Sequence, residues 1–146
     1  MQAQSDVRIE TDCSLPVDSV VRLYRDGGWW KDSDDPAAIP LLLKGSFMVA
    51  SAWAGRDLVG MGRVLSDGFS DAYIQDVVVL RNFRGKGIGG RLVAHLRDRC
   101  IDLGILWVGL IAEPGTTSFY ERLGFNAMPG NVPMVLRPAR HAGESI

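Results

Sequence analysis

Cysteine and histidine are scarce in this 146-residue sequence, with two residues of each, and the scarcity restricts the metal and disulfide chemistry open to the chain. Cys13 and Cys100 lie far apart, and neither has a partner at CxxC spacing. No cluster of cysteine and histidine has the spacing of a metal site, so we expect no bound metal. Two buried thiols in a reducing compartment are the favoured interpretation, and one long-range disulfide is the alternative.

A long apolar run is also missing. The longest, residues 105–112, is far shorter than the roughly 20 residues that cross a bilayer. Residues 1–6 lack the basic and apolar regions of a signal peptide, so we expect a cytoplasmic protein without a membrane partner. The composition, 47% apolar and 23% charged, excludes a disordered or collagen-like chain. The length fits a single domain over residues 1–146, with a polar tail at about 138–146.

The chain has no large excess of either charge, because its formal net charge is −1, but the charges are unevenly distributed. Residues 26–35 are mostly acidic and residues 81–100 are mostly basic. The basic residues of the second segment are Arg81, Arg84, Lys86, Arg91, Arg97 and Arg99. A basic segment on a neutral protein favours a small anionic ligand over nucleic acid, which usually binds domains that are basic throughout. Two solvated surfaces are the alternative interpretation.

Hydrophobic periodicity and turn residues predict an α/β protein with the element order β-α-α-β-β-β-α-β-α-β. The expected strands are residues 7–10, 47–54, 58–65, 72–80, 105–112 and 132–137, and the expected helices are 16–26, 36–44, 87–103 and 116–123. Residues 105–112 are expected to form a buried strand, parallel to the strand at 72–80 through a right-handed crossover. The helix of this crossover, residues 87–103, should bury four apolar residues on one face: Ile88, Leu92, Leu96 and Leu103.

The most informative segment is the glycine-rich loop that follows the valine-rich strand and opens the long helix. Its glycines are Gly85, Gly87, Gly89 and Gly90. A helix N-terminus offers unpaired N–H groups and the positive end of the dipole, and glycines let an anion approach the backbone. The loop therefore predicts a phosphate cradle, with a glycine-rich structural turn as the alternative. Neither the Walker pattern nor the dinucleotide pattern is matched.

The segment Arg84-x-x-Gly87-x-Gly89 resembles the acetyl-CoA-binding signature (Q/R)-x-x-G-x-(G/A) of the GNAT superfamily of N-acetyltransferases. Residues 118–125, S-F-Y-E-R-L-G-F, resemble the F-Y-x-x-x-G-F segment of the same family. The resemblance covers roughly residues 7–137 and implies a GNAT-like fold, with a mixed, mostly antiparallel sheet flanked by helices. It also implies direct acetyl transfer from acetyl-CoA to a primary amine of a small molecule or peptide. A homodimer is compatible with the resemblance, since many relatives dimerise.

The resemblance implies roles for particular residues. Backbone groups of the valine strand would hold the pantetheine arm and the acetyl carbonyl, and the glycine loop would hold the pyrophosphate. The implied coenzyme-binding residues are Val77, Val78, Val79, Arg84, Gly85, Lys86, Gly87, Ile88, Gly89, Gly90 and Phe119. Tyr120 would protonate the departing CoA thiolate, which a phenol with a pKa of about 10 can do. Phe119 as a core aromatic and Tyr120 as a packing residue are the alternatives.

The base that deprotonates the amine is less defined. The position where relatives often carry a carboxylate falls on Tyr73, and Asp76, three places later, is the only acid within the strand expected at 72–80. Asp76 is either an inward-facing base or a hydrogen-bonded structural acid. Glu113 stands where many family members have an asparagine that contacts the coenzyme. Glu113 either leaves the coenzyme without this contact or faces a cationic acceptor instead.

Trp29 and Trp30 lie in the acidic loop and are the candidate acceptor-binding residues. An aromatic wall with carboxylates suits a cationic amine, and a solvated loop pinned by one tryptophan is the alternative. Three functions therefore remain: an acetyl-CoA-dependent N-acetyltransferase, a non-catalytic acyl-CoA sensor of the same fold, and a nucleic-acid-binding domain using the basic segment. The last lacks interleaved aromatic residues beyond Phe83 and is disfavoured.

Overall fold

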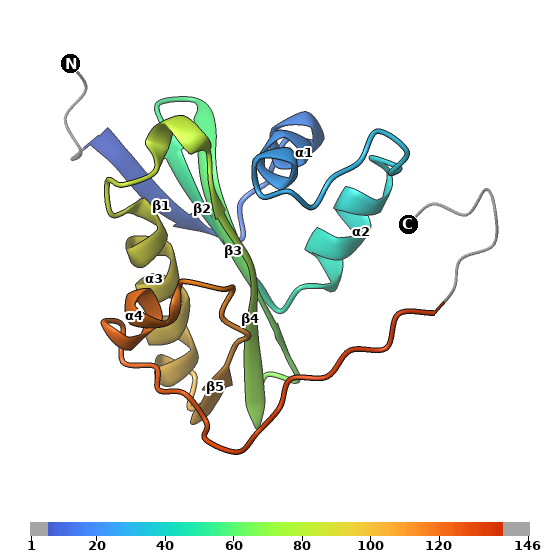
Figure 1. Cartoon of the computed structure of the whole chain (residues 1–146). Helices are drawn as coiled ribbons and strands as arrows, with labels where there is room; N and C mark the ends of the chain where they lie inside the picture. Colours follow the sequence, from blue (N-terminus) through green and yellow to red (C-terminus); the bar gives the residue numbers. More distant parts are fainter. Residues whose placement is uncertain (1–5, 139–146) are drawn as a thin grey trace.

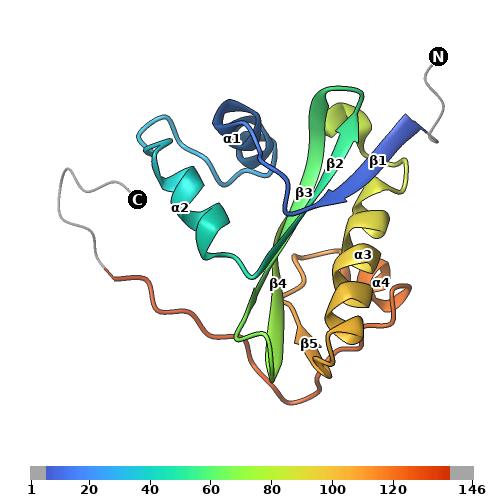
Figure 2. The same cartoon turned by 180° about the vertical axis from the view of Figure 1, so that it is seen from behind.

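The computed structural model describes residues 6–138, which form one five-stranded sheet with helices on both of its faces (Figure 1). The elements in chain order are β1 (Val7–Thr11), α1 (Val17–Asp26), α2 (Ala38–Gly45), β2 (Met48–Ala54), β3 (Asp57–Ser66), β4 (Asp71–Val79), the 3-10 helix η2 (Arg81–Phe83), α3 (Ile88–Asp102), β5 (Trp107–Gly109) and α4 (Thr117–Glu121). Helices α1 and α2 lie on one side of the sheet and α3 and α4 on the other, as the reverse view also shows (Figure 2).

The strands are arranged in sequence order, β1-β2-β3-β4-β5. The first four are antiparallel to their neighbours, whereas β5 is parallel to β4. A parallel pair needs a crossover connection, and α3 supplies it. The predicted α/β class and the predicted strand-helix-strand unit are therefore confirmed.

Helix α3 packs closely against the sheet because two glycines of β3 leave room for it. A Cβ atom on Gly60 would lie 3.1 Å from Leu92 Cδ1, and one on Gly62 would lie 3.1 Å from Leu96 Cδ1. Ile88, Leu92 and Leu96 are buried as predicted. The prediction for Leu103 is wrong, since 49% of that residue is exposed. It lies beyond the last turn of α3, where Gly104 adopts φ +82 and ends the helix.

Helix α1 covers the opposite face of the sheet. It buries Val20, Leu23 and Tyr24, which recur at the spacing of one helical face. Beyond its end, Trp29 N–H donates to the carbonyl of Tyr24, and the two rings meet edge to face with centroids 5.7 Å apart. The loop after α1 is thus anchored to the helix by a tryptophan.

The predicted strand at 132–137 is wrong, because this segment forms no strand in the structure. Its side chains are largely exposed: Met134 by 89% and Leu136 by 86%. Pro133 has no N–H to donate to a ladder, and the segment runs past the β3–β4 turn, where β4 starts, towards the side of α2 and away from the free edge of β5 (Figures 1 and 2). An apolar run makes a strand only where a partner edge is aligned with it.

The expectation of a buried strand over 105–112 is also corrected. Strand β5 has only three residues, and Leu106 and Ile111 are exposed by 90% and 74%. The reason is that β5 is the edge of the sheet, so nothing in residues 6–138 pairs with its outer side.

Both cysteines are free thiols, with Cys100 buried and Cys13 half-buried. In residues 6–138, no helix has the length and apolar character needed to span a membrane. All but the first residue of the predicted polar tail lies outside the described residues.

Candidate active site

The glycine-rich loop lies at the end of β4 and leads directly into α3. Gly85 and Gly87 have φ angles of +78 and +80, a region that favours glycine over any other residue. A Cβ atom added to either glycine would meet nothing within 4 Å, so their surroundings are open. The first N–H groups of α3, from Ile88 to Gly90, have no carbonyl of a preceding turn to bind. This arrangement can bind an anion through its backbone.

The side chain of Arg84 is hydrogen-bonded to the backbone on either side of the glycine-rich loop's attachment to the fold, at β4 and at α1. Its Nε donates to the carbonyl of Val79 at 2.9 Å, and its Nη2 donates to the carbonyl of Asp26 at 2.8 Å. Lys86 lies over the ring of Phe83, 5.3 Å from the centroid. The guanidinium of Arg84, which the sequence placed among the coenzyme-binding residues, thus ties the loop to the end of β4 and to α1.

Strands β4 and β5 separate after a short ladder, and this opens the sheet beside the loop. Their pairing ends at Tyr73 and Gly109, while β4 continues to Val79. The later backbone of β4 therefore has no partner strand on the β5 side. Val78 is buried in the core and Val77 and Val79 are half-buried, so a ligand in this opening would meet mainly backbone groups.

The two segments that resemble family signatures meet in space. A Cβ atom on Gly89 would lie 3.6 Å from Phe119 Cζ, and one on Gly90 would lie 3.9 Å from Phe119 Cε2. Phe119 thus packs on the first turn of α3. Tyr120 follows it in α4, with its ring 4.9 Å from that of Phe119 and 6.0 Å from that of Phe125, centroid to centroid. The phenol is therefore held beside the glycine-rich loop by aromatic packing.

The environment of Tyr120 keeps its hydroxyl protonated. Burial raises the pKa of this phenol above its ordinary value, and the negative charge of Glu113 raises the pKa further. Both effects disfavour the phenolate. A phenol that stays protonated through the neutral range can act as a proton donor, and Glu113 is one reason why it does.

One carboxylate oxygen of Asp76 accepts two hydrogen bonds. Its Oδ2 accepts a hydrogen bond from the hydroxyl of Tyr24 at 2.9 Å and one from Nε of Arg63 at 2.7 Å. The sequence had left open a free base or a hydrogen-bonded acid, and this carboxylate is hydrogen-bonded. Tyr24 and Arg63 were not singled out by sequence, because their distance from Asp76 along the chain hides the contact.

The acidic loop presents one exposed tryptophan. Trp29 is 40% exposed, while Trp30 packs against the hydrophobic core. Most of the nearby carboxylates have local partners: Asp32 pairs with Arg25 at 2.7 Å, and Asp34 accepts from the backbone of Lys31. Both tryptophans therefore hold the loop, Trp30 by packing against the core and Trp29 by packing on Tyr24, and the exposed part of the Trp29 ring is the aromatic surface that remains.

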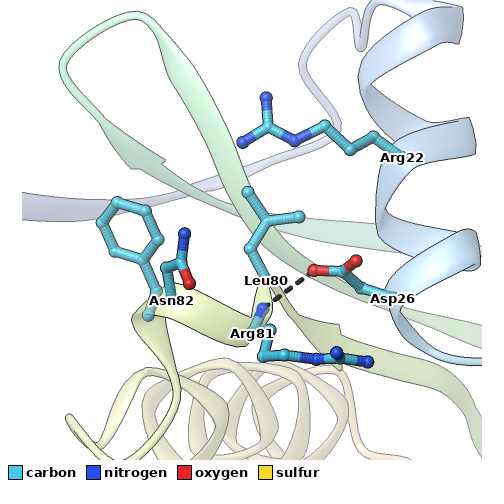
Figure 3. Close-up of a pocket in the computed structure, with 6 residues that line it drawn as sticks. Arg22, Asp26, Leu80, Arg81 and Asn82 are labelled. Atoms are coloured by element: carbon cyan, nitrogen blue, oxygen red, sulfur yellow. Dashed lines mark hydrogen bonds between the residues drawn. The ribbon is translucent and has the colours of Figure 1, made fainter.

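A pocket of about 330 Å³ lies between α1 and η2, and the sequence analysis did not find it. It is lined by Arg22, Asp26, Leu80, Arg81, Asn82 and Phe83 (Figure 3). A carboxylate oxygen of Asp26 accepts from the backbone N–H of Arg81 at 2.9 Å, the dashed line in Figure 3. Arg22 and Asp26 are four residues apart on one helix, a spacing that places them on the same face.

Two arginines of α3 bind backbone carbonyls elsewhere in the chain. Arg91 donates to the carbonyl of Val7 at 2.7 Å, and Arg97 donates to the carbonyl of Leu123 at 2.8 Å. Together with Arg84, they connect α3 and its loop to other parts of the chain. Within residues 6–138, no group of three or more His, Cys, Asp or Glu side chains is placed to hold a metal ion.

Comparison with known proteins agrees with this geometry. The sequence model of the "Acetyltransferase (GNAT) family" matches residues 11–125, which is most of the chain. The chain belongs to this family of acetyltransferases, and its five-stranded sheet flanked by helices is the fold of that family. It is therefore an acyltransferase by family.

Relatives and solved structures support the same assignment. An uncharacterized N-acetyltransferase (ycf52) of Pyropia yezoensis is 30% identical over 131 residues, covering 87% of this chain and 74% of that protein. Serotonin N-acetyltransferase 2 of Oryza sativa subsp. japonica is 40% identical over 84 residues, covering 55% of this chain and 40% of that protein. A GNAT-family acetyltransferase of Streptococcus pneumoniae has the same fold, with a TM-score of 0.75 at 24% identity over 92% of this chain and 99% of that one.

Proposed function

We propose that this protein transfers the acetyl group of acetyl-CoA directly to a primary amine of a small molecule or peptide. The observation that supports the proposal is the packing of Phe119 on Gly89 and Gly90, with the ring of Tyr120 4.9 Å from that of Phe119, centroid to centroid. The pairing of β4 with β5 ends at Tyr73, before the valines of β4 that lead to the glycine-rich loop. The relative named serotonin N-acetyltransferase supports an amine as the acceptor.

The residues divide the chemistry among them. Backbone N–H groups from residue 84 to residue 90 would bind the pyrophosphate, and backbone groups of Val77 and Val79 would bind the pantetheine arm and the acetyl carbonyl. When bound, acetyl-CoA supplies the thioester that the amine attacks. Tyr120 would then donate its phenolic proton to the sulfur as the carbon–sulfur bond breaks, the attacking nitrogen would lose its proton to solvent, and solvent would return a proton to the Tyr120 oxygen. Trp29 is the proposed aromatic wall for a cationic acceptor.

The test compares coenzyme binding with turnover in Tyr120→Phe. Removal of a general acid lowers kcat by about 100-fold or more, whereas the Kd of CoA, measured by calorimetry, should stay within about 2-fold of wild type. Thiol release from acetyl-CoA with a panel of primary amines measures kcat. Wild-type turnover of the substituted enzyme on every accepted amine would show that Tyr120 is not the acid.

A sensor that holds acyl-CoA without turnover is the second candidate, and the same assays separate it from the enzyme. Binding of CoA without thiol release from any amine would favour the sensor. No heat with either CoA or acetyl-CoA would overturn both proposals.

A further inference from the structure

We propose that Asp76 is a positioning residue: it fixes the bend of β4 at the thioester and ties helix α1 to that bend, and it is not the base of the reaction. The inference rests on the acetyl transfer proposed above and gives roles to Tyr24 and Arg63. Three independent features of the structure carry it: the backbone of Asp76, the contacts of its carboxylate, and the elements from which its partners come.

The backbone of Asp76 forms a bulge in β4. In the pairing of β3 with β4, Met61 faces Val78 and Arg63 faces Gln75, so Asp76 and Val77 together oppose the single residue Gly62. Asp76 has a φ of +55, which costs free energy for any residue except glycine. Such bulges bend a strand and redirect its neighbours. This bulge lies just beyond the last pair of β4 with β5, where the opening begins.

The carboxylate of Asp76 is held by two donors from other parts of the chain. It forms an ion pair with Arg63 at 2.7 Å, and the same oxygen accepts from the hydroxyl of Tyr24 at 2.9 Å. The side chains of Arg63 and Asp76 are only 14% and 26% exposed. Both donors are side chains of the protein, so their contacts hold this carboxylate in one position beside the bulge. Burial and the charge of Asp76 also raise the pKa of Tyr24, which stays protonated and keeps donating.

The partners of Asp76 connect the acceptor side of the fold to the coenzyme side. Tyr24 belongs to the last turn of α1 and carries Trp29 against its ring. Two residues later, Asp26 accepts from the N–H of Arg81 through its carboxylate and from Arg84 through its carbonyl. The end of α1 therefore holds β4 at its bulge and the chain just after β4. An acceptor bound against Trp29 would be aligned with the thioester through these contacts.

The experiment compares Asp76→Asn, which removes the charge that pairs with Arg63, with Tyr24→Phe, which removes the hydrogen bond to Asp76 without touching a candidate base. Misplacement of reacting groups by a fraction of an ångström lowers rates appreciably, so we expect both to lower kcat by about 10-fold. Both should keep the shape of the wild-type pH profile of kcat/KM. The amide ¹H–¹⁵N shift of Val77 should change in both variants without any substrate present.

A base would give a different pattern. Asp76→Asn would lower kcat by about 100-fold or more and remove the acidic limb of the pH profile, while Tyr24→Phe would keep wild-type rates. That result overturns the proposal, as do wild-type kcat and unchanged Val77 shifts in both variants. Asp12→Asn is the matched control for folding, because Asp12 also has a positive φ, +53, and its carboxylate accepts from the N–H of Val49. It should leave kcat unchanged.

The outcome also separates this inference from the proposed function. If wild-type protein neither binds CoA nor releases thiol, the acetyl transfer fails, and the Val77 shifts still decide whether Tyr24 and Asp76 set the bulge. If the wild type turns over and Tyr24→Phe does so equally well, only the positioning role fails. Urea midpoints of all variants establish that each compared protein is folded.

Discussion

At the scale of single residues, two glycines of β3 decide how near α3 can come to the sheet. The Cβ of a larger residue at position 60 would meet Leu92 Cδ1 at 3.1 Å and the backbone carbonyl of Val78 at 3.2 Å. A side-chain methyl can move aside, but a carbonyl in a β ladder cannot do so without disturbing the sheet. Since α3 begins directly after the glycine-rich loop, these glycines also fix the position of the loop.

Gly60→Ala should therefore destabilise the protein, by about 1–3 kcal/mol, because it overpacks the interface of α3 with the sheet. Gly45→Ala is the matched control: a Cβ atom there would meet nothing within 4 Å, at the end of α2. Urea denaturation followed by circular dichroism measures both. Equal stability of Gly60→Ala and wild type would mean that α3 does not lie as close as described.

At the scale of elements, the β3–β4 hairpin shows how a short turn is fixed by one carboxylate. Oδ1 of Asp67 accepts from the backbone N–H groups of Phe69 and Ser70, each at 2.8 Å, and Oδ2 accepts from the Ser70 hydroxyl at 2.6 Å. These hydrogen bonds lower the pKa of Asp67 to about 2, and the one from the Ser70 hydroxyl has the largest effect. Aspartate is well suited to such turns for this reason.

This shift predicts a pH dependence of stability. Because the pKa of Asp67 is lower in the folded state than the ordinary value of about 3.9, its contribution is full above about pH 4 and is lost as the pH falls towards 2. In Asp67→Asn the turn can keep an acceptor that does not titrate. The difference in urea midpoint between wild type and Asp67→Asn should therefore change between pH 5 and pH 2. A difference that stays constant over this range would contradict the assignment.

At the scale of the whole molecule, stability comes from one core, and the end of the described chain lies outside it. The sheet and α3 share buried residues such as Met61, Leu92 and Leu96, all with no exposed surface. Met134 and Leu136 are exposed by 89% and 86%. Two leucines, Leu96 and Leu136, therefore contribute very differently to the free energy of unfolding, because only the first is buried.

Leu96→Ala should lower the free energy of unfolding by about 2–5 kcal/mol, because it leaves a cavity between α3 and β3. Met134→Ala should change it by less than about 0.5 kcal/mol, as expected for an exposed side chain away from the core. Chemical denaturation of the two variants at one pH gives both values. A large loss for Met134→Ala would show that residues 132–137 pack against the protein in solution.

Local patterns in the sequence determined the order of helices and strands as far as α4, the antiparallel part of the sheet and the glycine-rich loop. They could do so because periodicity, turn residues and helix ends depend on neighbouring residues. The likeness of two short segments to family signatures also identified Tyr120 and Phe119, which lie beside that loop in the structure.

Only the tertiary structure decided the rest, because it depends on contacts between distant parts of the chain. It brought Tyr24 and Arg63 to Asp76, and it directed Arg84 to the carbonyl of Asp26. It also left residues 132–137 without a partner strand, although their apolar pattern is typical of one. A strand needs an aligned edge and a carboxylate takes its role from what surrounds it, and neither is encoded in a local run of residues.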